Sequence, residues 1–404
     1  MDITRKNFLR GAALAAAGGL FARVSTAMGN AQEKTRIPAR SNLIREVEVF
    51  PYTIKEKVVV KISLGSEEYA ENLLVRVRTE DGVVGIGEGS PYTAITGETQ
   101  QSAVVIAKRL GEMLRGRDPF TIARIVADMD AFAPHDPSSK AALEMAVWDI
   151  CGKITGQPVC CLLGRYRETF DTDKTIFLDP PEAMAQAAQQ VVAQGFKTVK
   201  CKVGQSPEID TARLRAIREA VGPDIHIRID ANQGWTPAEA VRCLRQIERY
   251  QIQFAEQPIP SWDWSGMKFV RDHAPIPVMV DESVHVEQDA MEGIRREAVD
   301  LINIKLMKSG GILHGMRIAE VAEAADLKCM VGCMTESNVG LTAAAHLVCA
   351  QKCIQYGDLD AALFLTETPS LGGMEIRDGM VTVPKKPGLG LDLDPAFMAR
   401  LHAA

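Results

Sequence analysis

Between residues 174 and 358 the sequence repeats a short apolar run followed by a longer amphipathic stretch. The runs end in charged or polar residues, and successive ends are about 25 residues apart, the length of one strand, one helix and two loops. Strands and helices that alternate in this way form parallel sheets. The repeat therefore predicts a parallel β/α barrel.

A different pattern precedes the repeat. From 43 to 88 apolar and polar residues alternate as in strands, and Glu80-Asp81-Gly82 is a turn signal between two runs. From 99 to 163 the apolar residues follow a helical period that prolines interrupt. These patterns predict a small α+β domain ahead of the barrel.

The patterns together predict three parts in the mature chain. We expect the α+β domain, which would cap the barrel, over 41–168 and the barrel over 172–368. The remaining residues, 369–404, are rich in Gly and Pro with short β pieces, and we expect them to pack on the capping domain.

The N-terminus resembles an export signal. Charged residues up to Arg10 precede an Ala/Gly-rich run that ends near Ala22, and small-residue cleavage sites follow. Residues 1–31 therefore predict a twin-arginine-like signal peptide, with Lys6 where the second arginine normally stands. Such a signal predicts a periplasmic or otherwise exported protein, with the cytoplasm as the alternative.

The composition argues against some classes of binding partner and indicates the state of the cysteine thiols. The chain has 404 residues and a formal charge of −6 without a long basic stretch, so we expect no nucleic-acid partner. Beyond the signal, no stretch reaches the ~20 apolar residues of a membrane span.

The nine cysteines are an odd number without a Cys-x-x-Cys pair, which predicts buried free thiols. Cys201, between two lysines, is expected to face the outer helices by strand alternation.

Six charged residues stand at or near the ends of five consecutive predicted strands. They are Lys200, Lys202, Asp230, Glu256, Asp281 and Lys305. Barrels of this kind keep their chemistry at the carboxyl ends of the strands. If these side chains share the inward parity of their strands, all six converge on the mouth of the barrel.

The three carboxylates indicate a metal site. Asp230, Glu256 and Asp281 would form an oxygen-only cluster, which suits one Mg²⁺ per subunit better than zinc. Asn232 and Gln233 are candidates for supporting groups around it. Glu282 is expected to point away from the cluster and to cap the next helix.

The lysines suggest proton transfer on two faces of one carbon. A metal ion that holds a substrate carboxylate stabilises the enolate formed when the adjacent α-proton leaves. Lys202 and Lys305 would remove and return that proton from opposite sides. Lys200 is expected to lower the pKa of its neighbour Lys202.

These residues together resemble the enolase superfamily, in its muconate-lactonizing-enzyme subgroup. The segments Ala146-Val147-Trp148-Asp149 and Leu162-Leu163-Gly164 match as well as the six charged residues. The resemblance implies an α/β fold, a modified TIM barrel (β/α)₇β whose α+β capping domain is completed by the C-terminal tail. It also implies Mg²⁺ on the three carboxylates, with Lys202 and Lys305 as the acid/base pair.

The segment Asp358-Leu359-Asp360 is similar to the Asp-x-Asp of dipeptide epimerases. There the two carboxylates hold the free α-ammonium group of the substrate, and alternation places both on one face. Lys200 is a further candidate substrate contact. The resemblance implies an isomerase that epimerises the α-carbon of the C-terminal residue of a dipeptide, in a chain expected to be a homo-oligomer.

Alternatives stay open at this point. An o-succinylbenzoate synthase or cycloisomerase of the subgroup, or an N-acylamino acid racemase, would share the metal and lysine residues. A non-catalytic exported binding protein could keep the fold alone. The acidic loop 64–69 has no arginine, unlike some L-Ala-Glu epimerases, which leaves a non-acidic or even cationic dipeptide open as the substrate.

Overall fold

The computed structural model describes residues 42–404 of the chain. The predicted signal peptide, residues 1–31, lies outside the described residues. Within 42–404, no helix combines the length and the hydrophobicity that a membrane span requires.

The described chain begins with an antiparallel meander of three strands, β1 (Ile44–Ile62), β2 (Gly65–Thr79) and β3 (Val84–Gly89). The predicted turn between β2 and β3 is present, and Gly82 in it has a φ of 88°, which glycine adopts readily. Helices and one short strand follow: α1 (Thr93–Thr96), α2 (Gln100–Leu114), α3 (Ile122–Phe132), α4 (Pro137–Thr155), α5 (Val159–Leu162) and β4 (Thr169–Asp171).

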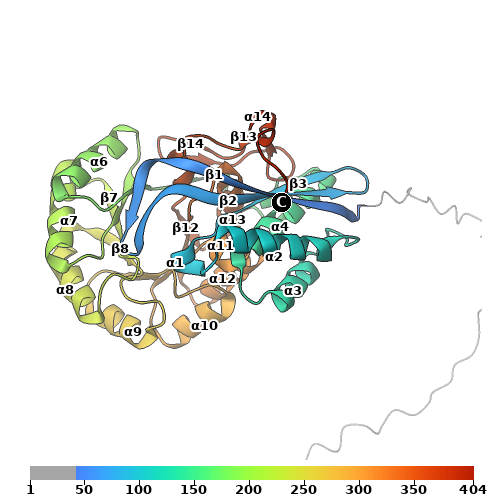
Figure 1. Cartoon of the computed structure of the whole chain (residues 1–404). Coiled ribbons are helices and arrows are strands. Elements are labelled where there is room, and N and C mark those ends of the chain that lie inside the picture. Colours follow the sequence, from blue (N-terminus) through green and yellow to red (C-terminus); the bar gives the residue numbers. More distant parts are fainter. Residues whose placement is uncertain (1–41) are drawn as a thin grey trace, which may run out of the picture. The chain divides into compact units, whose positions relative to one another are not determined.

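An eight-stranded parallel sheet forms the next part (Figure 1). Its strands are β5 (Lys174–Ile176), β6 (Thr198–Lys202), β7 (His226–Asp230), β8 (Ile252–Glu256), β9 (Val278–Val280), β10 (Leu301–Ile304), β11 (Lys328–Val331) and β12 (Ile354–Gly357). The strands pair in sequence order, and a parallel bridge between Thr172 and Gly357 joins the two edges. The predicted modified TIM barrel is therefore confirmed.

Helices connect the barrel strands and cover their outer faces. They are α6 (Pro181–Ala193), α7 (Pro207–Val221), α8 (Pro237–Ile247) with η1 (Glu248–Tyr250), α9 (Trp264–His273), α10 (Glu287–Arg295), α11 (Leu306–Ser309), α12 (Ile312–Ala324) and α13 (Asn338–Ala350). Cys201 is fully buried in the hydrophobic cluster that includes these helices, as alternation predicted. All nine cysteines lie in the described range as free thiols, and seven of them are buried.

Inside the barrel, alternation separates a packed layer from a charged one. Phe254, Met279 and Met330 belong to a small buried cluster near the middle of the strands. The guanidinium group of Arg228 lies 5.2 Å from the Phe254 ring centre and 5.0 Å from that of Tyr356. The inward positions closer to the carboxyl ends are therefore left for the charged residues.

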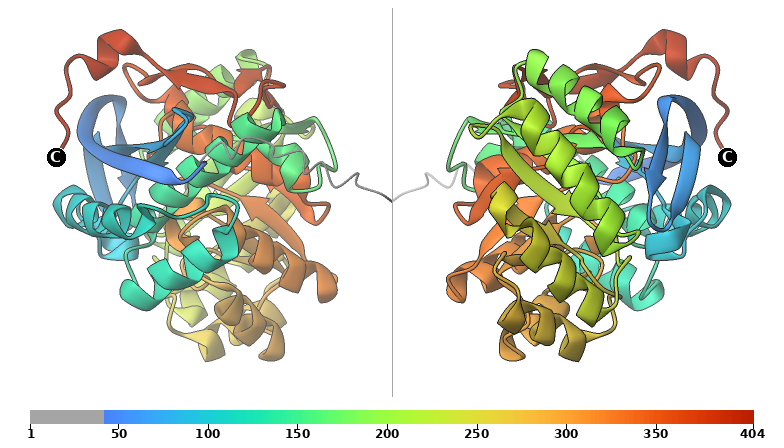
Figure 2. Two further views of the ribbon diagram at one scale, coloured as in Figure 1. Left: turned by 90° about the vertical axis from the view of Figure 1, so that its right-hand side faces the viewer. Right: turned by 90° about the vertical axis from the view of Figure 1, so that its left-hand side faces the viewer.

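The C-terminal residues return to the first strands. They form η2 (Ala361–Leu363), β13 (Ser370–Gly372), β14 (Glu375–Arg377), β15 (Met380–Thr382), β16 (Leu391–Leu393) and α14 (Pro395–Met398). Figure 2 shows this red segment lying over the blue strands. Phe397 packs edge-on against Tyr52, with ring centres 5.6 Å apart, and Ala404 N–H donates to Val49 O at 2.8 Å.

Two buried carboxylates of the N-terminal part cap barrel helices. Glu144 of α4 accepts the N–H groups of Ile312 and Leu313, at the start of α12, at 2.6 and 2.8 Å. Glu88 of β3 accepts those of Ser337 and Gly340, at the start of α13, at 2.8 and 2.7 Å. The first N–H groups of a helix have no partner within it, so these carboxylates satisfy donors that would otherwise be buried unpaired.

A histidine on the barrel connects the same two parts. His314 of α12 lies with Nε2 2.9 Å from Asp130 of α3 and Nδ1 2.8 Å from Glu287 of α10. Burial lowers the pKa of His314, but the two carboxylates outweigh it and hold the pKa above its ordinary value.

The β1–β2 hairpin crosses the carboxyl end of the barrel (Figure 1). Near the middle of β1, Glu56 bridges Leu365, and Lys57 N–H donates to Phe364 O at 2.7 Å. At the tip, the Ser63 hydroxyl donates to Ala231 O at 2.8 Å. The hairpin therefore spans from the segment after β12 to the end of β7.

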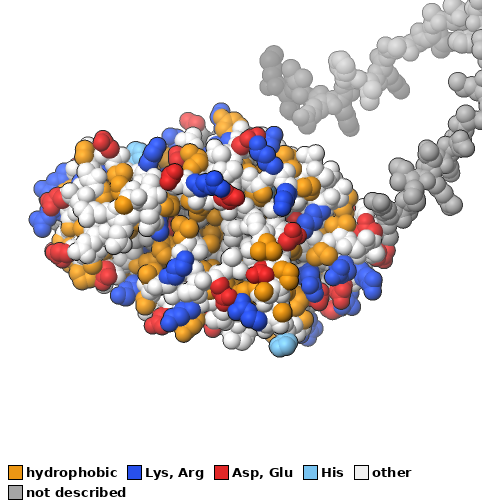
Figure 3. Space-filling model, turned by 90° about the horizontal axis from the view of Figure 1, so that it is seen from above, with side chains coloured by type: hydrophobic (Ala, Val, Ile, Leu, Met, Phe, Trp, Pro, Cys, Tyr) orange, Lys and Arg blue, Asp and Glu red, His pale blue; other side chains and the backbone are white. Residues whose placement is uncertain are grey.

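On the face of the molecule seen in Figure 3, basic and acidic side chains are intermixed.

Candidate active site

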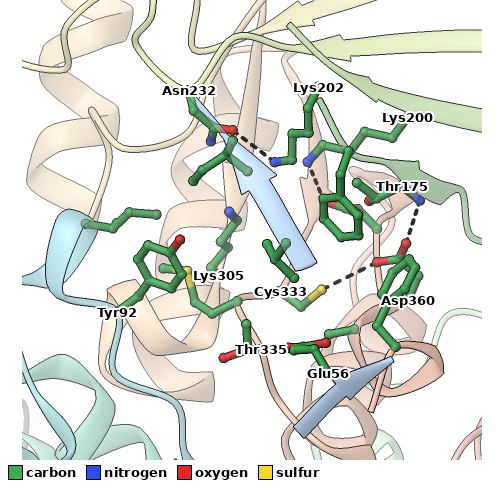
Figure 4. Close-up of a pocket in the computed structure, with 18 residues that line it drawn as sticks. Glu56, Tyr92, Thr175, Lys200, Lys202, Asn232, Lys305, Cys333, Thr335 and Asp360 are labelled. Carbon is green, nitrogen blue, oxygen red and sulfur yellow. Dashed lines mark hydrogen bonds and ion pairs between the residues drawn. The ribbon is translucent and has the colours of Figure 1, made fainter. Parts of the chain in front are cut away.

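The six strand-end charges predicted from the sequence gather at the carboxyl end of the barrel, where the three lysines line one cavity and contact the three carboxylates. Asp230 and Glu256 are the last residues of β7 and β8 and are partners in register. Asp281 directly follows β9, and Lys305 directly follows β10. β6 and β10 are four positions apart in the eight-stranded order, so Lys202 and Lys305 enter the cavity from opposite sides (Figure 4).

The two lysines of β6 contact different sets of carboxylates. Lys200 Nζ lies 2.7 Å from Asp358, 2.8 Å from Glu256 and 3.2 Å from Asp230. Lys202 Nζ lies 2.7 Å from Asp230 and donates to Asn232 Oδ1 at 3.1 Å. Lys200 thus connects the carboxylate cluster to the Asp358 segment, whereas Lys202 faces the cavity beside Asp230.

Asp281 is held by two ammonium groups. Lys305 Nζ is 2.8 Å from Oδ2, and Lys308 Nζ is 2.7 Å from Oδ1. Lys308, the third residue of α11, is fully buried and also donates to the carbonyl of Val284 at 2.9 Å. Lys308 therefore holds the Asp281 carboxylate at Oδ1, whereas Lys305 is closest to Oδ2. This role of Lys308 was not predicted from the sequence.

The pKa values of the three carboxylates are driven apart by their surroundings. Burial raises the pKa of Asp230, but Lys202 and Lys200 outweigh it and lower the value to about 2. In Asp281, Lys305 and Lys308 likewise outweigh burial and hold the pKa below its usual range. Burial and the charge of Asp230 raise the pKa of Glu256 to about 8. The lysines therefore stabilise the charged forms of Asp230 and Asp281 more than that of Glu256.

The residues present fit a divalent cation. The donor set consists of carboxylate oxygens from three adjacent strand ends, the hard ligands that Mg²⁺ prefers. Glu256 Oε2 and both Asp281 carboxylate oxygens are buried, and each lies 2.7–2.8 Å from the ammonium group of one lysine. A carboxylate oxygen can accept more than one partner, so these buried oxygens can also bind a cation.

Lys305 gives a second reason to expect a cation. Burial lowers its pKa, but Asp281 outweighs that effect and holds the pKa above the ordinary lysine value. A lysine that accepts a proton near neutral pH needs the opposite shift. Sharing Asp281 with a metal ion would weaken its hold on the Lys305 proton.

The prediction for Glu282 is wrong. Its side chain is buried beside the cluster and accepts from Asn232 Nδ2 at 3.2 Å. The next helix is capped by Asp289, which accepts from the N–H of His285 at 2.9 Å and from that of Val286 at 3.1 Å. The chain leaves the strand after Val280, so alternation no longer decides where Glu282 points.

The two expected supporting residues lie in different places. Asn232 contacts Lys202 and Glu282, and its N–H donates to Asp230 Oδ1 at 2.9 Å. Gln233 instead accepts from Ser261 N–H at 2.9 Å, between the loops after β7 and β8. Only Asn232 is in contact with the charged cluster.

Asp358 and Asp360 lie at the other end of the cavity. Asp358 is paired with Lys200, which outweighs burial and holds its pKa below the usual range. Asp360 accepts Thr175 N–H at 2.6 Å, and burial and the neighbouring Asp358 raise its pKa to about 6. Asp360 therefore faces the cavity with a carboxylate that no basic side chain of the described residues pairs with at salt-bridge distance.

The cavity itself occupies about 620 Å³ including its opening, which lies within the range of small-molecule sites. The barrel supplies its charged floor. The capping domain supplies the remaining wall with Glu56, Val60, Ile62, Tyr92 and Ile95. These capping residues were not predicted, because only the folded capping domain brings them to the barrel.

Comparisons with known proteins agree with this architecture. Residues 44–164 match the family model "Mandelate racemase / muconate lactonizing enzyme, N-terminal domain", and residues 182–397 match "Enolase C-terminal domain-like". The hydrophobic dipeptide epimerase of Enterococcus faecalis is 42% identical over 86% of this chain and 99% of its own. The L-Ala-D/L-Glu epimerase of Clostridium acetobutylicum is 36% identical over 87% and 99%.

A solved structure gives the same relationship in three dimensions. The E. faecalis dipeptide epimerase, crystallised with Mg and the dipeptide L-Leu-L-Tyr, superimposes with a TM-score of 0.85 at 42% identity. The match covers 87% of this chain and 99% of that one.

Proposed function

Because this chain belongs to the mandelate racemase/muconate lactonizing enzyme family of the enolase superfamily, we propose that it is a magnesium-dependent dipeptide epimerase. The reaction inverts the α-carbon of the C-terminal residue of a dipeptide. The alternatives of the same subgroup share the metal and lysine residues, so the choice depends on the groups that recognise the rest of the substrate.

Asp230, Glu256 and Asp281 are the residues that would hold Mg²⁺. When bound, the ion would hold the substrate carboxylate and stabilise the negative charge that develops as the α-proton leaves. Lys308 and Asn303 support these ligands: Lys308 contacts Asp281, and Asn303 Nδ2 donates to Glu256 Oε1 at 2.8 Å.

Lys202 and Lys305 are the proposed acid/base pair. They enter the cavity from opposite sides of the barrel, so a carbon between them could lose its proton to the neutral amine of one lysine and regain a proton from the ammonium group of the other. Each lysine is the base when one epimer reacts and the acid when the other epimer reacts. For Lys200, which is paired with three carboxylates and also lines the cavity, we propose a contact with the substrate rather than proton transfer.

The observation that carries the dipeptide assignment is the buried acidic pair Asp358 and Asp360. Lys202 and Lys305, which contact the proposed metal ligands, line the same cavity as Asp360, so one dipeptide could present its carboxylate to the metal site and its α-ammonium group to Asp360. Lactonizing and o-succinylbenzoate-forming reactions, and N-acylated amino acids, offer no ammonium group to this end of the cavity. Asp358 is paired with Lys200, but no basic side chain of the described residues lies at salt-bridge distance from Asp360, so burial of Asp360 is unfavourable without such a counter-charge.

Proton exchange tests this function directly. Wild-type protein with Mg²⁺ in D₂O should replace the α-hydrogen of the C-terminal residue of L,L-dipeptides by deuterium and generate the L,D-epimers, as measured by ¹H NMR. N-acetylated amino acids and o-succinylbenzoate precursors should give no product. Turnover of the acetylated compounds alone would contradict the assignment.

A further inference from the structure

Glu56 is a buried carboxylate that the proposed reaction does not use. It lies on β1 and lines the cavity from the capping domain, with 6% of the residue exposed (Figure 4). Its Oε2 is buried and accepts no hydrogen bond from the described residues. No lysine or arginine within 42–404 lies within salt-bridge distance of it, although charged residues of both signs surround the rest of the cavity.

The hairpin places Glu56 at one definite end of the cavity. Glu56 pairs with Leu365, which follows Asp360 by five residues, whereas Ser63 at the hairpin tip is bonded to Ala231, next to the metal-site residue Asp230. Glu56 is therefore at the end that receives the amino-terminal residue of a dipeptide.

The neighbouring inward positions of β1 are apolar. Val60 and Ile62 also line the cavity, and both lie between Glu56 and the hairpin tip. Ile95 adds a further apolar side chain from the capping domain. The wall next to the C-terminal residue of a dipeptide is thus apolar, and the wall next to its amino-terminal residue ends in a carboxylate.

The α-ammonium group of the substrate does not account for Glu56. Asp360 and Asp358 are already present for that group, so Glu56 is a third acid at the same end. Burial raises the pKa of Glu56 to about 7, and the charges of Glu67 and Asp360 add to this effect. An acid in this position is unfavourable without a cation, and a second positive charge on the substrate would supply one.

Resting on the proposed epimerase function, we propose that Glu56 selects dipeptides whose amino-terminal residue carries a cationic side chain, lysine or arginine, and whose C-terminal residue is apolar. The long methylene stem of such a side chain would lie along the apolar cavity wall, and its charged end would reach the Glu56 carboxylate.

Two dipeptides whose amino-terminal side chains share the same carbon chain distinguish the effect of charge from that of apolar contact. L-Lys-L-Leu and L-norleucyl-L-leucine differ at the amino-terminal side chain by its ammonium group. Wild-type kcat/KM should favour the lysine compound by about tenfold or more, the usual size of a hydrogen bond to a charged group. Glu56→Gln keeps the side-chain shape and should remove that preference. Glu68→Gln, at an exposed position of the same hairpin, is the matched control and should retain it.

Each outcome decides the proposal. A wild-type enzyme that epimerises both dipeptides without favouring lysine overturns the proposal and leaves the epimerase function standing. An equal loss on both dipeptides in Glu56→Gln, with an unchanged melting temperature, also overturns it, because Glu56 would then hold the α-ammonium group. If L-Leu-L-Lys is the substrate that depends on Glu56, the placement at the amino-terminal residue is wrong. Failure on every dipeptide would remove the epimerase function itself.

Discussion

Lys305 Nζ lies 2.8 Å from the carboxylate of Asp281, so the proposed base on one side of the cavity is paired with a proposed metal ligand. On the opposite side Lys202 is paired in the same way with Asp230, at 2.7 Å. Each base is thus positioned by one of the carboxylates that would hold the cation. Losing a base and losing a ligand should consequently give different defects.

Loss of a base should affect one face of the substrate. Lys202→Ala and Lys305→Ala should each lower the epimerisation rate by about 10²–10⁴-fold, the usual contribution of a general acid or base. Each variant should still exchange the α-proton of one epimer, and the two variants should exchange opposite epimers. ¹H NMR in D₂O with separate L,L and L,D dipeptides measures this. Exchange of the same epimer by both variants would contradict the two-face arrangement.

Loss of a metal ligand should affect both epimers alike. Asp230→Asn, Glu256→Gln and Asp281→Asn should abolish exchange of either epimer and weaken Mg²⁺ binding by more than the roughly 10–100-fold that changes in supporting residues cost. Titration calorimetry measures the affinity, and circular dichroism checks that the variants remain folded. Wild-type protein treated with EDTA should be inactive and should recover when Mg²⁺ is returned. Full activity in EDTA would exclude the metal role.

Asp360 should matter only for substrates with a free amino group. Asp360→Asn should lower kcat/KM for free dipeptides by an amount corresponding to about 3–5 kcal/mol, the cost of removing one partner of a buried ion pair. N-acetylated dipeptides, which lack the charge, should be processed at similar low rates by the variant and the wild type. Asp358→Asn is a less selective test because Asp358 also holds Lys200 at 2.7 Å. Equal losses on both substrate classes would make Asp360 a structural residue.

The His314 contacts should make stability depend on pH. The pKa of His314 is raised in the folded protein, so its stabilising contribution is complete below the unfolded value of about 6.5 and is lost as the pH rises through the folded value. His314→Gln should cost on the order of 2 kcal/mol near pH 5.5, and the difference from wild type should shrink above pH 6.5. Urea unfolding at several pH values measures this. A difference that is constant with pH would mean that His314 is neutral in the folded protein.

The sequence predicted those parts of the site that depend on strand order and alternation. Asp230 and Glu256 end regular strands, so their register and parity could be deduced from the chain. Glu282 was wrongly assigned because the strand before it ends at Val280. Lys308 lies on a one-turn helix whose burial follows from packing rather than from a pattern. Glu56 reaches the cavity through a pairing with Leu365, more than 300 residues away, which no local pattern indicates.

The caps that Glu88 and Glu144 place on α13 and α12 have a consequence for how this protein can be divided. The two family models split the chain into modules, but a barrel expressed alone would expose two helix starts whose donors are satisfied only by the missing module. Folding of the two modules should therefore be cooperative. A chimera that takes its capping domain from a relative to alter substrate choice would have to carry acids at both positions. Without them the barrel itself would be destabilised.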